Sequence, residues 1–159
     1  RRTSQNIVIG GAAGALPPVI GWTIATNSLS LEPITFFIII FLWTPSHFWA
    51  LSLYKAEDYK KAKIPMLPVT NGIQNTKKNI LIYSLLMIPT IIFPYYLEFT
   101  GEIFLIIGLM LTAYYNLICY QLYSFTKNRF EISKAKHVFS YSIIYLFLLF
   151  VLFLVDRLI

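Results

Sequence analysis

A histidine and an aspartate stand near the end of one apolar stretch, and both side chains are suited to acid–base or ligand chemistry. His47 lies within residues 36–54, which are long and apolar enough to cross a bilayer. An ionisable side chain at that depth is costly unless it faces protein, water or a ligand, so it marks a candidate functional site. Asp58 follows where the chain enters a charged segment. We therefore expect a site that joins an intramembrane imidazole to a carboxylate at the membrane surface.

The spacing of the surrounding residues favours a single helical face. If the helix continues through this aspartate, the residues that share the face are Trp43, His47, Tyr54 and Asp58. Ala50 lies on the same face and leaves room there for a ligand or a neighbouring helix. Trp49 points about 200° away from His47. Pro45 is expected to kink the helix and could turn Trp43 off the stripe.

Packing explains the same stripe without chemistry. Trp43 and Tyr54 would then be anchors at the membrane interface, where such residues are common. His47 would be hydrogen-bonded to a neighbouring helix. These alternatives stay open on the spacing alone.

Residues 57–63 combine two acids with three lysines. Mg²⁺ usually binds through one or two carboxylates together with substrate phosphates, and lysines supply point charge to phosphate oxygens. The segment would therefore suit an amphiphile with a diphosphate head and an apolar tail. Mixed charge is also common in ordinary loops, so this signal is weak by itself.

The composition indicates an all-α polytopic membrane protein. Of the 159 residues, 57% are hydrophobic and only 13% are charged, about half the usual charged share of a soluble domain. The net charge of +6 is explained by membrane topology, so nucleic acid is not expected as a partner. Cys119 is the only cysteine and is expected to pack as a small apolar residue.

Five transmembrane helices are predicted, and the basic residues set their orientation. The expected spans are 7–26, 34–54, 80–97, 103–123 and 138–155. In the first span, Gly10 and Gly14 would allow close helix approach, and Pro17 and Pro18 would kink or break the helix. All but one of the 13 Lys and Arg residues fall on one side of the membrane. The positive-inside rule makes that side cytoplasmic, with the N-terminus inside and the C-terminus outside.

Three segments resemble a known family of enzymes. They are RRTSQNIVIGGAAGALPPVIGW, FLWTPSHFWAL and EDYKKAKIPMLPV, which cover much of residues 1–69 in the family's order and spacing. The chain resembles the UbiA superfamily of intramembrane prenyltransferases, within it the branch of protohaem IX farnesyltransferases, or haem o synthases. Residues 70–159 add a compatible helix pattern.

The resemblance implies a nine-helix bundle around a central cavity, with the five spans of this chain as helices five to nine. Residues 1–159 would then be the C-terminal part of a single membrane domain in the inner (plasma) membrane of a bacterium. Two acidic motifs would bind Mg²⁺ and the diphosphate of farnesyl diphosphate, and the second maps onto Asp58. The first motif is absent from this chain, so we expect the chain alone to be inactive.

The implied reaction transfers a farnesyl group to the vinyl group of haem b, which gives haem o for terminal oxidases. Asp58 would bind the metal, Tyr54 would stabilise the allylic cation, and His47 would ligate haem iron or accept a proton. A downstream haem a synthase is an expected partner, besides the lipid bilayer. The residues expected to bind substrate are Arg1, Arg2, Asn6, Trp43, Lys60 and Lys61, with Trp43 lining the cavity for the prenyl tail.

Two positions depart from related patterns. The wider superfamily often has an acid at the position of Tyr54, and the haem branch usually has proline at the position of Ser46, which can instead hydrogen-bond back along its own helix. Two alternatives to the main interpretation remain: a prenyltransferase acting on a quinone precursor, and a membrane transporter.

Overall fold

The structure is a computed structural model that describes residues 3–124 and 128–158, and side chains from residue 132 onwards in the second range. All secondary structure in these described residues is helical. The helices are α1 (Asn6–Ala15), α2 (Pro17–Thr26), α3 (Leu31–Tyr54), α4 (Ala56–Lys61), α5 (Leu67–Thr70), α6 (Ile73–Tyr96), α7 (Glu102–Ser124) and α8 (Asn128–Leu158).

Five helical segments are long and apolar enough to cross a membrane, as the sequence predicts. They are Asn6–Thr26, Leu31–Tyr54, Ile73–Tyr96, Glu102–Ser124 and Ile132–Leu158. Because lipid cannot satisfy backbone polar groups, a chain that crosses the bilayer five times has to form helices of this kind. The protein is therefore a multi-pass membrane protein.

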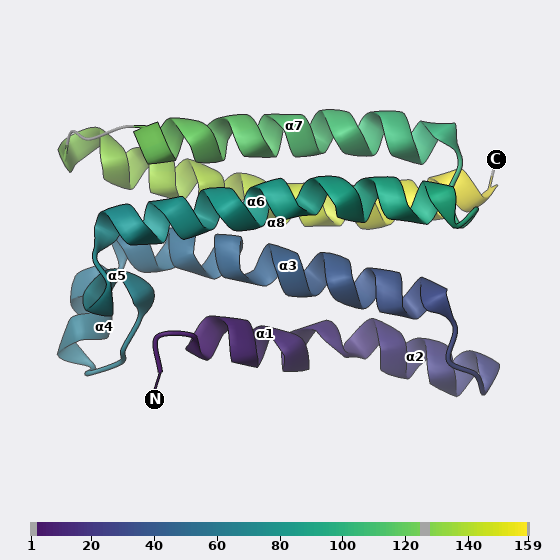
Figure 1. Cartoon of the computed structure of the whole chain (residues 1–159), viewed down its shortest axis with the longest axis horizontal. Coiled ribbons are helices and arrows are strands. Elements are labelled where there is room, and N and C mark those ends of the chain that lie inside the picture. The colour runs from purple at the N-terminus through teal and green to yellow at the C-terminus, as the bar shows by residue number, and fades with distance from the viewer. Residues whose placement is uncertain (1–2, 125–127, 159) are drawn as a thin grey trace.

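Four of these helices form a closed bundle, and the first span packs against its outside. α3 contacts α6 and α8, and α7 contacts the same two helices on the opposite side. α1 and α2 contact only α3 and each other among the described helices. Figure 1 shows this layered arrangement, with the chain ends at opposite ends of the molecule. An odd number of crossings requires that separation.

The first span is interrupted where the prolines predict. Leu16 separates α1 from α2, and its backbone N–H bonds to the carbonyl oxygen of Ala13 instead of continuing the regular ladder. Pro17 occupies the first position of α2, where its missing N–H costs nothing.

The close approach in this span involves a different glycine from the predicted pair. A Cβ atom at Gly11 would lie 3.0 Å from Cγ2 of Thr44 on α3, whereas Gly10 and Gly14 face open space. The prediction that Gly10 and Gly14 bring helices together is therefore wrong for the described helices, because the buried face of α1 is rotated by one residue. Their open face matters for the site.

The bundle interior combines aromatic side chains with small polar ones. Tyr115 and Tyr145 are fully buried between α7 and α8, and their rings stack at 5.0 Å. The Tyr145 hydroxyl lies 2.9 Å from Thr112 Oγ1, so its polar atom is satisfied inside the bundle. Cys119 is also fully buried and packs as the small apolar residue that the sequence predicts.

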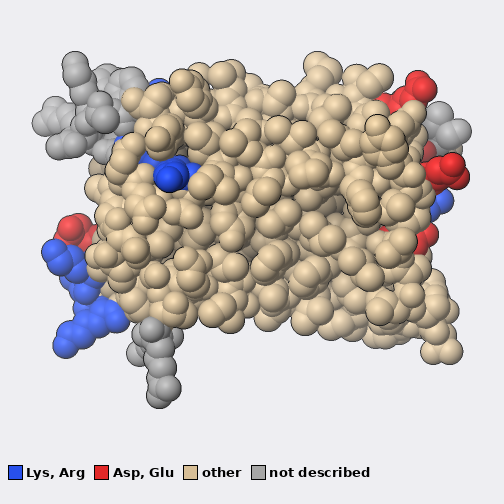
Figure 2. Space-filling model, in the orientation of Figure 1, with Lys and Arg blue, Asp and Glu red and all other residues tan. Residues whose placement is uncertain are grey.

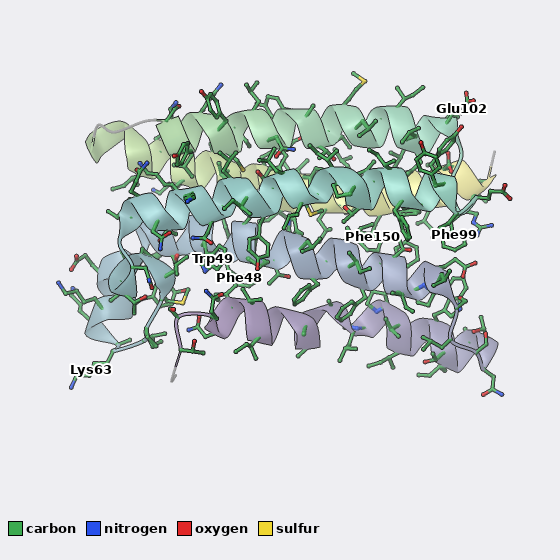
Figure 3. The ribbon with its side chains drawn as sticks, in the orientation of Figure 1. Phe48, Trp49, Lys63, Phe99, Glu102 and Phe150 are labelled. Atoms are coloured by element: carbon green, nitrogen blue, oxygen red, sulfur yellow. The ribbon has the colours of Figure 1, made fainter. Side chains whose placement is uncertain are left out.

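Charged side chains gather at the two ends of the molecule and leave the middle apolar. Figure 2 shows basic residues mainly at the end that carries α4, and acidic residues mainly at the other. Figure 3 likewise places Lys63 at the first end and Glu102 at the second. This separation matches the charge pattern from which the orientation is predicted.

Candidate functional site

The helix that carries the histidine ends sooner than the stripe requires. α3 ends at Tyr54, Lys55 leaves helical geometry with φ −109° and ψ 15°, and α4 begins at Ala56. Asp58 therefore lies on a separate short helix, and the expected single helix through Asp58 is wrong. Its carboxylate is exposed and pairs with Lys55 Nζ at 3.2 Å. The direction of this carboxylate is therefore set by α4 and not by the face of α3 that carries His47.

The predicted stripe holds within the membrane, where three aromatic rings are stacked. The His47 ring lies between Trp43, with centroids 4.3 Å apart, and Phe139 of α8, 4.5 Å away. Both contacts are nearly parallel, with interplanar angles of 19° and 24°. Pro45 lies inside the helix, and Trp43 stays on the stripe beside His47. The imidazole is thus held on both faces.

One residue of α8 forms hydrogen bonds with two members of this stack. His47 Nδ1 lies 2.6 Å from Ser142 Oγ. The indole N–H of Trp43 donates to the backbone carbonyl of Ser142 at 2.9 Å. The hydrogen bond of His47 to a neighbouring helix, which the sequence leaves as an alternative, is therefore present. It does not by itself exclude a chemical role, because Nδ1 is only one of two ring nitrogens.

The two other residues that the sequence assigns to faces of this helix behave as expected. Ala50 is fully buried, so a neighbouring helix, and not a ligand, fills its space. Trp49 is 1% exposed and contacts the edge of Tyr83 on α6. It therefore belongs to the core on the other side of α3.

A lysine from the last helix meets the outer end of the stripe. Lys136 Nζ lies 5.7 Å from the ring centroid of Tyr54, and Phe139 approaches the same ring edge-on at 6.0 Å. The sequence assigns Lys136 only to membrane topology. The structure shows that its ammonium group also lies over the Tyr54 ring. The faces of aromatic rings attract cations.

A groove of about 400 Å³ runs between α1 and α3. Its size falls within the range of small-molecule sites. The residues that line it are Asn6, Ile7, Gly10, Gly11, Gly14, Ile40, Trp43, Thr44 and Phe48. Trp43 and Phe48 also contact the His47 ring. Figure 3 shows the position of Phe48, which lies on α3 together with His47. The groove is therefore adjacent to the stack of Trp43, His47 and Phe139, which we call the histidine clamp.

The groove is apolar along its length and polar at one end. Asn6 begins α1, and its Nδ2 lies 3.6 Å from Sδ of Met66, which precedes α5 at the charged end of the molecule. The Asn6 Oδ1 atom is buried without a hydrogen-bond partner, so a donor is missing there. Two predicted substrate residues, Asn6 and Trp43, are thus brought to one groove.

Of the remaining predicted substrate residues, the two that the structure describes do not line the groove. Lys60 and Lys61 lie on α4 with exposed side chains. Arg1 and Arg2 lie outside the described residues. Lys77, which the sequence assigns to topology alone, is only 2% exposed at the start of α6. Lysine is almost never buried so fully unless it is paired, and a single sequence carries no signal for such burial.

Ser46, at the position where proline is expected, joins two helices across the bundle. Its hydroxyl donates to the Trp43 carbonyl at 2.9 Å, the predicted bond back along its own helix. Its oxygen lies 2.8 Å from the Tyr115 hydroxyl of α7. Since the single Ser46 proton is used within α3, Tyr115 is the donor in this contact.

The carboxylates near Asp58 decide how well the residues fit Mg²⁺, the metal that the resemblance implies. Within the part of the chain that the structure describes, no group of three or more His, Cys, Asp or Glu side chains could hold a metal ion. Asp58 and its neighbour Glu57 are exposed beside two lysines. They fit Mg²⁺ that arrives with a diphosphate and keeps several waters. They do not form a closed metal cage.

The sequence profile of the UbiA prenyltransferase family matches residues 1–143 of the chain. Three curated relatives are similar along its length. Protoheme IX farnesyltransferase of Pelagibacter ubique is 72% identical over 99% of this chain and 52% of the relative. The enzyme of the same name from Parvibaculum lavamentivorans is 46% identical over 99% and 49%. Protoheme IX farnesyltransferase 1 of Pseudomonas fluorescens is 48% identical over 99% and 51%.

The chain therefore spans about half the length of the curated relatives that it matches. No solved structure matches it at a significant level.

Proposed function

Because the chain belongs to the UbiA prenyltransferase family, we propose that it is the C-terminal part of an enzyme that farnesylates haem b to haem o. The observation that carries this proposal is the groove between α1 and α3. It has an apolar wall, a polar end at the charged surface, and a histidine clamp beside it. The names of the similar proteins support the same reaction.

The groove suits the prenyl tail. Its floor includes Gly10 and Gly14, which leave open space above the helix. Trp43 supplies an aromatic wall. A ligand pocket of this kind is expected to be mostly apolar with a few placed polar groups. The amide of Asn6 supplies the polar group at the end where a diphosphate would lie.

The charged segment suits the head group. The Asp58 carboxylate would hold Mg²⁺, and Lys60 and Lys61 would contact diphosphate oxygens. When bound, Mg²⁺ supplies positive charge that stabilises the leaving diphosphate. Arg1 and Arg2 stay as predicted contributors from outside the described residues.

The transfer itself needs one bond to break and one to form. The allylic C–O bond breaks and diphosphate leaves with the electron pair, while the vinyl group of haem b supplies the pair for the new C–C bond. Water then adds to the electron-deficient carbon and loses a proton. Tyr54 would stabilise the allylic charge with its ring face, and His47 would accept the proton.

The wider setting is part of the same proposal. The basic end would face the cytoplasm of a bacterium, as the positive-inside rule predicts, and the bilayer would be its inner membrane. Haem o would pass to a haem a synthase. The upstream half of the enzyme would supply the first acidic motif and complete the diphosphate site.

The direct test is a product assay in membranes that contain this chain with its native upstream region. Haem b, farnesyl diphosphate and Mg²⁺ are supplied, and haem o is measured by mass. We expect product that disappears with EDTA and in an Asp58→Ala variant that still inserts into the membrane. Normal haem o formation by Asp58→Ala would contradict the metal role.

The same assay separates the alternatives. Pyrophosphate release with unmodified haem would indicate another acceptor, such as a quinone precursor. A folded protein that releases no pyrophosphate would contradict the proposed function and favour a transporter.

A further inference from the structure

We propose that Ser142 is a positioning residue that keeps the ring proton of His47 on Nδ1 and leaves the Nε2 lone pair free to accept a proton. The assignment of the proton rests on contacts between α3 and α8 alone. Its chemical use rests on the proposed function, in which His47 takes a proton from water.

The argument begins with the single proton of the Ser142 hydroxyl. Ser142 Oγ donates to the backbone carbonyl of Phe139 at 2.6 Å. His47 Nδ1 contacts the same oxygen at 2.6 Å. A serine hydroxyl has one hydrogen to give and two lone pairs to accept with. Since the Ser142 hydroxyl hydrogen is donated to the Phe139 carbonyl oxygen, the proton in the contact between His47 and Ser142 comes from His47 Nδ1.

The surroundings keep the imidazole in this orientation. A half-turn of the ring would replace Nδ1 with a C–H group and lose the bond to Ser142, which is fully buried. Trp43 and Phe139 cover the two ring faces. The indole N–H of Trp43 also bonds to the Ser142 carbonyl at 2.9 Å. Ser142 therefore fixes both the ring and one of the two aromatic residues that hold it.

The second nitrogen remains available. His47 is 7% exposed, and among the described residues Nε2 has no hydrogen-bond partner. Nε2 is not fully buried, so it is not sealed off. Phe48 and Trp43, which touch the ring, belong to the groove wall. The His47 ring thus lies next to two residues of the wall of the groove proposed for the substrate.

The proton balance then follows. Water that adds to the electron-deficient carbon transfers a proton to Nε2, and the ring becomes an imidazolium. Its Nδ1–H stays bonded to Ser142 Oγ, so no second proton has to move. The aromatic faces of Trp43 and Phe139 favour the positive charge that forms. A histidine whose other nitrogen is held by a partner in this way has a defined tautomer.

The tautomer is measured directly by nitrogen NMR of the lipid-reconstituted chain labelled with ¹⁵N-histidine. The chain has only two histidines, and a His137→Gln variant assigns the signals. We expect the His47 signals of a neutral ring with Nδ1 protonated and Nε2 unprotonated. A protonated Nε2 in the unsubstituted chain would overturn the proposal.

Substitution of Ser142 tests its role in turnover, in the chain with its native upstream region. Ser142→Ala should lower kcat about 10- to 100-fold, by analogy with the loss of a partner that orients a metal-bound histidine. The KM for farnesyl diphosphate should stay unchanged, and the Nδ1–H tautomer should lose its dominance. Ser142→Thr, which keeps the hydroxyl, should restore both. An unaltered tautomer in Ser142→Ala would overturn the proposal.

Ser52→Ala is the matched control. Ser52 is equally buried and bonds back to the Trp49 carbonyl at 2.9 Å, and among the described residues its side chain has no hydrogen-bond partner on another helix. It should leave the His47 signals and kcat unchanged. If the unsubstituted protein shows the Nδ1–H tautomer but makes no haem o, the proposed function fails while the Ser142 contact stands.

Discussion

At the scale of single residues, the site depends on side chains of α3 whose ring faces and hydrogen-bonding atoms contact residues of other helices. Tyr54 shows this best. Its neighbour in the sequence is Lys55, but the cation over its ring is Lys136, 5.7 Å away on α8. The ring therefore already attracts one positive charge, and the allylic cation of the proposed reaction would have to use the face that Lys136 does not cover.

Substitution of Tyr54 separates its ring from its hydroxyl. We expect Tyr54→Phe to retain most farnesyl transfer, because the π face remains. Tyr54→Leu should reduce kcat by roughly 30-fold, which corresponds to about 2 kcal/mol for a desolvated cation–π contact. Turnover of the two variants in the haem o assay is the measurement. Equal losses in both would contradict the role of the ring face and point to the hydroxyl.

At the scale of elements, the first span divides its faces between packing and the groove. Gly11 lets α1 approach Thr44 of α3 closely. Gly10 and Gly14 face open space and line the groove. This division turns an apolar helix pair into a cavity, because side chains are missing where the groove runs.

Filling the groove should stop substrate binding without disturbing the bundle. We expect Gly10→Leu or Gly14→Leu to raise the KM for farnesyl diphosphate by about tenfold or more, since a leucine would occupy the volume of the tail. Gly21→Leu is the matched control: Gly21 also faces open space but does not line the groove. Kinetics in the haem o assay decide the matter. A similar KM for all three variants would contradict the groove as the tail site.

At the scale of the whole molecule, the end opposite the charged segment is closed by the last helix. The Asp156 carboxylate accepts hydrogen bonds from the backbone N–H of Gly101 at 2.6 Å and of Phe104 at 3.1 Å. It therefore caps the start of α7 from α8. A carboxylate also interacts favourably with the positive end of a helix dipole.

Removal of that cap should destabilise the bundle and leave the site chemistry alone. Asp156→Ala should lower the free energy of unfolding by about 1 kcal/mol, the usual cost of losing a helix cap. Glu98→Gln, at an exposed position of the same connection, should change little. Thermal unfolding in detergent measures both. An Asp156→Ala protein as stable as its parent would contradict the capping role.

The sequence by itself determined the features that follow from length, hydrophobicity and charge. Apolar runs of spanning length must become helices in lipid, so the number and order of the five spans are predicted correctly, whereas the third and fifth helices begin earlier than predicted, at Ile73 and by Ile132. Basic residues in alternate connections predict that positive charge gathers at one end of the bundle, which is the end that carries α4. The spacing of Trp43 and His47 predicts their shared face, because both lie within one regular helix. The interruption at Pro17 follows from proline chemistry.

Only the tertiary structure decided which residues from distant parts of the chain meet. Nothing local in the sequence indicates that Ser142 holds His47, that Lys136 covers Tyr54, or that Lys77 is buried. The break at Lys55 could not be predicted from the helical pattern either, because the residues before it and residues 56–61 after it both form helix. Helix periodicity fixes directions within one helix, whereas rotation and register between helices come from packing. The free nitrogen of His47 is a property of that packing.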